Sequence, residues 1–162
     1  MGNAPEMVAG IIDDIRRIFK VVNEYSKTAE RETGLTGPQL WAIKTIAAAG
    51  QIKPSDLARR MYLHPATVVG LIDRLENRGL VSRTRLQKDR RIVEIALTER
   101  GEALLALAPD VPQGTLIKGL EILSGERLLH VSEGVTELVR ILGAERVAPQ
   151  LLHSPEVNQP SG

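Results

Sequence analysis

The spacing of the apolar residues changes once between residues 54 and 101, and this change constrains the fold more than any other feature. Up to Arg78 the spacing is helical, in two short segments separated by a turn at residues 62–63. From Leu80 it alternates, before and after a polar turn at residues 87–91. Two helices, a tight turn and a β-hairpin follow one another in a winged helix-turn-helix. This order predicts one helix for the DNA major groove and a hairpin, the wing, for the DNA backbone or minor groove.

Helical spacing also dominates the segment before residue 54. Apolar residues recur at intervals of three and four over residues 8–32, which predicts one long helix. Thr36 and Gln39 have the spacing of a capping box, and the helix that they open is expected to end at Gly50.

The C-terminal part is expected to be helical as well. A fifth helix is predicted over about residues 98–108, and prolines and a glycine at residues 109–114 interrupt the pattern. A short segment at residues 116–123 precedes a final helix over residues 124–142, and a flexible polar tail over residues 149–162 is expected to follow. The fold class is therefore mainly α, with a small β-hairpin wing.

Charge is unevenly distributed along the chain. Residues 51–100 contain 11 Lys and Arg against 6 Asp and Glu, whereas the remainder contains 10 basic and 14 acidic residues. A solvated charged surface would not require this segregation, whereas binding of a polyanion by one module would.

Composition excludes several other classes. The chain has no cysteine, so disulfides, thiolate metal sites and thiol-based redox switching are excluded. The four aromatic residues are too few for stacking on single-stranded nucleic acid. No apolar run is long enough to span a membrane and no signal peptide is recognised, so a cytoplasmic protein is expected. The spacing of a metal site is absent from the three histidines, His64, His130 and His153, and the sequence contains no catalytic motif. We therefore predict no metal, no cofactor and no enzyme activity.

The helix predicted from Pro65 to Arg78, the recognition helix, has two different faces. On a helical wheel Val68, Leu71, Ile72 and Leu75 form a core face. The opposite side and the helix start supply small, polar or basic residues suited to a groove, with Thr67 suited to a phosphate or thymine and Arg74 to a guanine or phosphate. These candidate DNA contacts are His64, Ala66, Thr67, Gly70 and Arg74. An ordinary amphipathic helix with a polar outer face is the alternative.

The hairpin is the sharper signal. Six of the fourteen residues from Arg78 to Arg91 are basic, and a cationic tip can enter the negative potential of a minor groove. Asp89, two residues before Arg91, can brace its guanidinium. The candidate wing residues are Arg83, Arg85, Lys88, Asp89, Arg90 and Arg91. The alternative is a solvated turn that uses charge for solubility.

Several motifs at fixed spacing carry a family resemblance. They are Leu57-Ala58, the run VGLIDRLENRGL from Val69 to Leu80, the D-x-R of Asp89–Arg91, and the L-T-x-x-G of Leu97–Gly101. Together they resemble the winged-helix core of MarR-family transcriptional regulators, and the flanking helices extend the resemblance to about residue 144.

The resemblance implies a homodimer whose two winged helices bind a pseudo-palindromic DNA operator. Residues 35–109 would be the DNA-binding domain, and residues 1–34 and 110–148 a helical dimerisation region. This accounts for apolar stripes on the first and last helices that one small core could not cover. The chain departs from the family pattern at His64, where a hydroxyl residue usually caps the recognition helix, and at the interruption over residues 109–114.

Members of the family often release DNA when a small anionic or aromatic effector binds between the two parts. Ile15, Phe19 and Trp41 are the residues that we expect near such a pocket, and a purely structural role in the core is the alternative. The predicted function is that of a sequence-specific regulator of transcription that binds double-stranded DNA, an effector-released repressor. The alternative is a winged-helix adaptor that binds proteins and does not read DNA.

Overall fold

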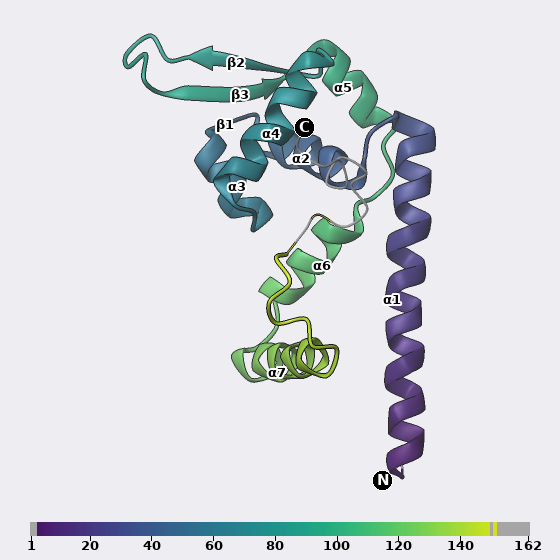
Figure 1. The fold of residues 1–162 in the computed structure, drawn as a ribbon. Coiled ribbons are helices and arrows are strands. Elements are labelled where there is room, and N and C mark those ends of the chain that lie inside the picture. The colour runs from purple at the N-terminus through teal and green to yellow at the C-terminus, as the bar shows by residue number, and fades with distance from the viewer. Residues whose placement is uncertain (1–2, 150, 152–162) are drawn as a thin grey trace.

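The computed structural model describes residues 3–149 and 151, and it is mainly helical with one small sheet (Figure 1). The predicted tail therefore lies almost entirely outside the described residues. In chain order the elements are α1 (Ala4–Thr33), α2 (Gly37–Ala49), β1 (Gln51–Ile52), α3 (Pro54–Met61), α4 (Pro65–Asn77), β2 (Val81–Arg85), β3 (Val93–Leu97), α5 (Glu99–Ala106), α6 (Pro112–Glu121) and α7 (Gly125–Ile141). The predicted fold class is confirmed.

The sheet is antiparallel, with strand order β1-β3-β2. The wing consists of β2, β3 and the turn between them, paired from Val81 opposite Leu97 to Arg85 opposite Val93. The two-residue strand β1, which sequence analysis did not predict, pairs Ile52 with Ile95 and anchors the wing to the end of α2. The far end of the hairpin extends away from the helices (Figure 1).

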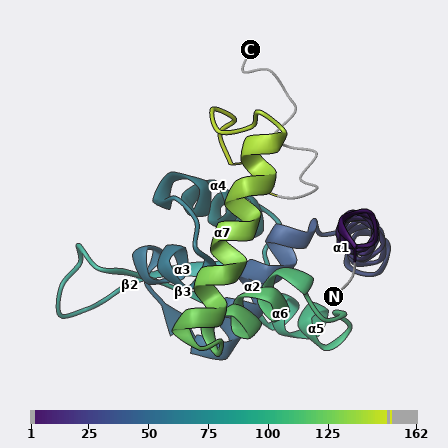
Figure 2. The same cartoon turned by 90° about the horizontal axis from the view of Figure 1, so that it is seen from below.

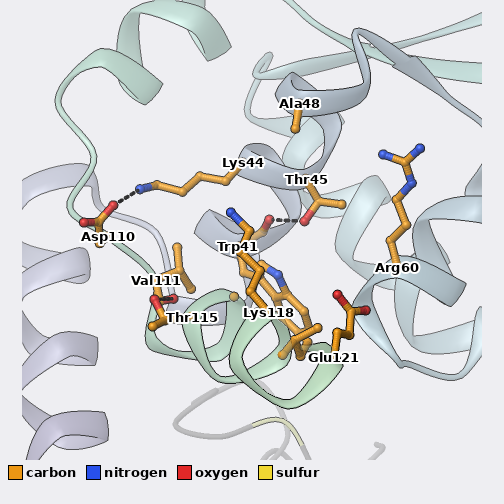
Figure 3. Close-up of a pocket in the computed structure, with 12 residues that line it drawn as sticks. Trp41, Lys44, Thr45, Ala48, Arg60, Asp110, Val111, Thr115, Lys118 and Glu121 are labelled. Atoms are coloured by element: carbon orange, nitrogen blue, oxygen red, sulfur yellow. Dashed lines mark hydrogen bonds and ion pairs between the residues drawn. The ribbon is translucent and has the colours of Figure 1, made fainter. Parts of the chain in front are cut away.

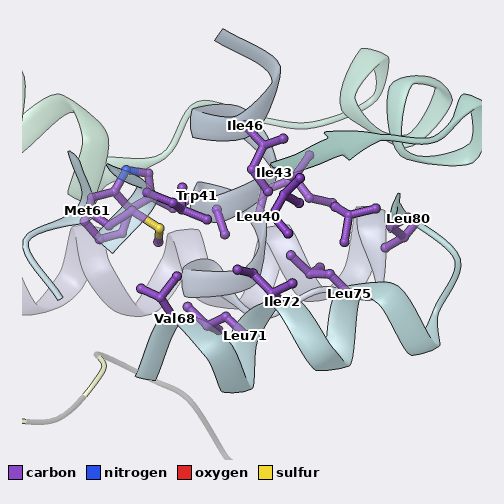
Figure 4. Close-up of a cluster of buried hydrophobic side chains, with 14 of the residues drawn as sticks. Leu40, Trp41, Ile43, Ile46, Met61, Val68, Leu71, Ile72, Leu75 and Leu80 are labelled. Carbon is purple, nitrogen blue, oxygen red and sulfur yellow. The ribbon is translucent and has the colours of Figure 1, made fainter. Parts of the chain in front are cut away.

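The core surrounds α2, which is apolar on almost every side and buried along most of its length. Leu40, Ile43 and Ile46 of α2 lie among the apolar face of α4 (Figure 4). Full burial of one such side chain contributes about 1.5–3 kcal/mol. This core fixes α3, α4 and the base of the wing in one unit.

Several predicted boundaries are wrong by a few residues. The first helix begins at Ala4 rather than residue 8, because Asn3 and Glu6 form a capping box. The fifth helix ends at Ala106 rather than residue 108. The interruption is also shorter than predicted, because Pro112 occupies the first turn of α6, where a proline is tolerated.

Two helices are poorly covered. At about 1.5 Å per residue, the 30 residues of α1 span roughly 45 Å, yet only Ala29 and Thr33 near its end are buried. No described residue of α7 is buried. Figures 1 and 2 show α1 standing beside the rest of the molecule. Among the described residues, no helix is both long and apolar enough to cross a membrane.

Candidate nucleic-acid interface

The turn between α3 and α4 sets the start of the recognition helix. Tyr62 adopts a left-handed conformation with φ of 53°, and the amide of Leu63 donates to the carbonyl of Ala58 at 3.0 Å. The Nδ1 atom of His64 then accepts a hydrogen bond from the amide of Ala66 at 3.2 Å. His64 therefore does cap the helix, through its imidazole.

The predicted division of α4 into two faces is present in the structure. Val68, Leu71, Ile72 and Leu75 are buried in the core (Figure 4). The other predicted contacts face outward, with Ala66 and Arg74 exposed and Thr67 and Gly70 half-buried. A Cβ atom at Gly70 would lie 3.8 Å from Nη1 of Arg74, so the arginine extends back along this face. Val69, the residue before Gly70, is also exposed, and the sequence pattern did not predict it as a DNA contact.

The tip of the wing carries exposed cations. Arg85 ends β2, and Lys88 and Arg90 lie in the turn that follows, all three exposed to solvent. Within the described part of the chain, these three side chains form no hydrogen bond or ion pair. Their charges are available to an external anion.

Asp89 braces Arg91 as the sequence spacing predicts. Its Oδ1 accepts hydrogen bonds from the backbone amide of Arg91 at 3.0 Å and from Nε at 3.1 Å, and Oδ2 accepts from Nη2 at 3.2 Å. These hydrogen bonds from Arg91 lower the pKa of Asp89 below its ordinary value. The Arg91 side chain is nevertheless 91% exposed, so it is oriented without being covered.

Arg83 differs from the other wing cations. Its Nη1 donates to a carboxylate oxygen of Glu76 and its Nη2 to one of Asp73, both on α4. The hydrogen bond to Asp73 is the largest cause of a raised Arg83 pKa. Arg83 therefore faces the recognition helix, whereas the other predicted wing contacts lie toward the tip.

Close packing and two hydrogen bonds hold the base of the wing against the ends of α4 and α5. Thr98 Oγ1 donates to the carbonyl of Gly79 at 2.6 Å and accepts from the amide of Gly101 at 3.1 Å. A Cβ atom at Gly101 would overlap the carbonyl oxygen of Leu80, so this position requires glycine. The L-T-x-x-G motif thus positions the wing, a role that its sequence spacing did not reveal.

The comparisons with known proteins agree with this geometry. The MarR family profile matches residues 35–93, which run from the start of α2 to the beginning of β3. The organic hydroperoxide resistance transcriptional regulator of Bacillus subtilis is 32% identical over 108 residues, 67% of this chain and 72% of that protein. The chain belongs to the MarR family of transcriptional regulators.

Two further similarities extend beyond the matched core. The HTH-type transcriptional repressor MdtR of Bacillus subtilis is 25% identical over 140 residues, 86% of this MarR-family chain and 90% of the relative. The structure of Streptococcus pneumoniae FabT in complex with DNA has a TM-score of 0.55 at 23% identity, over 84% of this chain and 97% of that one. The latter shows a shared fold.

The structure of this MarR-family chain does not bring together the three residues predicted for an effector pocket. Trp41 is a core residue that also lines a cavity of about 400 Å³ between α2 and α6 (Figure 3). Ile15 is half-buried and Phe19 is 62% exposed on α1, and neither lines that cavity. The core alternative therefore fits Trp41 and does not fit Phe19.

The cavity beside Trp41 has charged walls. Lys44 Nζ lies 3.6 Å from Oδ1 of Asp110, and Glu121 lies at the other end of α6 (Figure 3). The basic lining residues are Lys44, Arg60 and Lys118. A second, more apolar cavity of about 500 Å³ lies between α1 and α6. Within the described residues no cluster of three or more potential metal ligands occurs, and His153 lies outside them.

Two buried polar atoms lie near the junction of α1, α2 and α6. The hydroxyl of Tyr25 and the Oε1 atom of Gln113 have no hydrogen-bond partner among the described residues. Both side chains lie close to Gly37. Burial, together with the nearby Asp110 carboxylate, raises the pKa of Tyr25 to about 12.

Proposed function

We propose that this regulator binds a pseudo-palindromic operator in double-stranded DNA as a homodimer and represses transcription until a small effector releases it. Residues 35–109 would read DNA, and residues 1–34 and 110–148 would form the dimer. The observation that carries the proposal is the braced, exposed Arg91 on a cationic hairpin beside the outward face of α4. Its DNA partner would locate the protein in the cytoplasm.

The outward face of α4 suits a major groove. Ala66, Thr67 and Gly70 are small and allow close approach of the helix to base edges, and Arg74 can reach a guanine or a phosphate. At the helix start, exposed His64 is in position to contact a phosphate.

The wing suits the sugar-phosphate backbone and the adjoining minor groove. Arg85, Lys88 and Arg90 are assigned to phosphates because their charges are exposed and unpaired within the described chain. Arg91 is assigned to the minor groove. Its hydrogen bonds to Asp89 already restrict its rotamers, so the side chain loses less conformational entropy when it enters the groove.

The poorly covered helices support a homodimer. Large apolar side chains of α1 and α7 form exposed stripes, and stripes of this length on a monomer mark an interaction surface. The exposed residues are Met7, Val8, Ile11, Ile12, Ile18, Phe19 and Val21 on α1, and Leu128, Leu129, Val131, Val135 and Ile141 on α7.

The cavity beside Trp41 supports an effector of small size and anionic or aromatic character. Its volume fits a small molecule, its basic side chains can pair with an anion, and the indole offers an apolar wall. Because α2 and α6 bound it, a ligand there would touch both the DNA-reading core and the C-terminal helices.

The test selects duplexes that the full chain binds from a random-sequence pool and measures their affinity between 50 and 200 mM salt. We expect a selected pseudo-palindrome whose affinity falls steeply with salt, with a log–log slope of about −0.9 for each phosphate neutralised. No enrichment over non-specific duplex would reject operator binding and favour the protein-binding adaptor.

A further inference from the structure

The position of Arg83 in β2 sets its side chain apart from the rest of the wing. Side chains alternate along a strand, so Arg83 shares a face with Val81, whose side chain is buried, and with Arg85 beyond it. Close to the core this face lies against α4, to which Arg83 is hydrogen-bonded, whereas Arg85 lies further along the hairpin. The Arg83 side chain is accordingly only 31% exposed.

Its partners are the two acidic residues of α4. Asp73 and Glu76 are three positions apart and therefore lie on the same side of the helix. Arg83 divides its guanidinium between them, with one terminal nitrogen for each carboxylate. Strand β2 and the recognition helix are thereby linked at a point midway along the strand.

The two carboxylates have an electrostatic consequence for DNA binding. They belong to the helix proposed to enter the major groove, where phosphates would repel them. With Arg83 in place the three groups carry a net charge of −1, and without it they carry −2. Arg83 could reach a phosphate only by leaving both partners unpaired.

We propose that Arg83 is a positioning residue that holds β2 against α4 and screens Asp73 and Glu76 from DNA, and that it does not contact DNA itself. This inference rests on the proposed DNA binding. It removes Arg83 from the predicted DNA contacts and leaves the exposed cations near the tip as the wing residues that bind.

The test is a double-mutant cycle on the full chain, with Arg83→Met on one axis and Asp73→Asn with Glu76→Gln on the other. The probe is a duplex that the unchanged chain selects from a random-sequence pool, at fixed salt. We expect Arg83→Met alone to weaken binding about tenfold and to cost less than about threefold once both carboxylates are neutralised. An equal loss in both backgrounds would show direct contact and overturn the proposal.

Arg85→Met is the matched control, because Arg85 lies on the same strand and face and has no ion pair in the described chain. Its cost should be the same in both backgrounds.

Hydrogen exchange without DNA separates this inference from the proposed function. Arg83→Met should speed exchange of the β2 and β3 amides at least severalfold, and Arg85→Met should not. If the parent chain binds no duplex, the proposed function fails. If Arg83→Met leaves the exchange rates of the β2 and β3 amides unchanged, the positioning role is overturned, whatever the DNA-binding result.

Discussion

At the scale of single residues, the wing shows how one carboxylate can determine the use of an arginine. Asp89 accepts hydrogen bonds from both the backbone amide and the guanidinium of Arg91. The Arg91 side chain is therefore held in one orientation while its charge stays exposed to solvent. The spacing of the two residues was enough to predict this brace. The partners of Arg83 could not be predicted in the same way, because they depend on how the hairpin lies against α4.

Arg91→Ala should weaken operator binding by about 1–3 kcal/mol, because a groove contact is lost. The measurement is a fluorescence-anisotropy titration of a selected duplex at fixed salt. Unchanged affinity would remove the wing tip from the mechanism.

Gly101→Ala should destabilise the fold by about 2 kcal/mol or more, because the added methyl group overlaps the carbonyl oxygen of Leu80. Urea unfolding measures the change in free energy. Gly119→Ala in α6 is the matched control, since no atom of the described residues lies within 4 Å of its Cβ position, and it should be neutral or stabilise by up to about 1 kcal/mol. Equal effects at the two sites would contradict the close packing of Gly101 against the Leu80 carbonyl.

Tyr25 predicts a pH dependence at the alkaline end. Its folded pKa, about 12, exceeds the ordinary value of 10.0, so stability is full below pH 10 and declines as pH rises toward 12. Tyr25→Phe should weaken this decline and should not lower stability at pH 7, because the hydroxyl has no hydrogen-bond partner among the described residues. Chemical denaturation at pH 7, 10 and 11 tests both statements, and a marked loss at pH 7 would reveal a partner for the hydroxyl.

At the scale of elements, sequence periodicity predicted the helices and the hairpin but not the contacts that join them. Strand β1 has only two residues, too few to show alternation, and its partner β3 lies more than 40 residues away. Likewise Arg78 Nη1 donates to the carbonyl of Gly34 at 2.5 Å, connecting the end of α4 to the end of α1. The residues of the effector prediction failed to converge for a related reason, because the direction of α1 decides where Ile15 and Phe19 lie.

The apolar stripe of α1 gives the prediction at this scale. Ile11→Asp with Ile18→Asp should weaken dimerisation by roughly a hundredfold or more, since both exposed side chains would be buried by a partner. Sedimentation equilibrium measures the change. Lys20→Asp with Lys27→Asp is the control, because each lies nine residues further and so on the opposite side of the helix. A dimer unaffected by the isoleucine changes would place the interface elsewhere.

At the scale of the whole molecule, the proposed homodimer would present two α4 helices to one face of DNA, about 34 Å apart. Inserting five base pairs between the half-sites of a selected operator should reduce affinity toward that of a single half-site, because one half-site turns to the far side of the duplex. Gel-shift titrations of the parent, the insertion and a single half-site make the comparison. Full affinity after the insertion would contradict a rigid dimer that binds both half-sites at a fixed spacing.

The length of α1 has a consequence for how much regulator a cell must make. Most of this helix extends beyond the core, and most of a helix's stability in a protein comes from packing of its apolar face against other elements. Its folding and its association with a second chain would therefore be one equilibrium, second order in protein. Below the dissociation constant, operator occupancy would rise with the square of chain concentration, so a modest change in synthesis would act as a sharp switch.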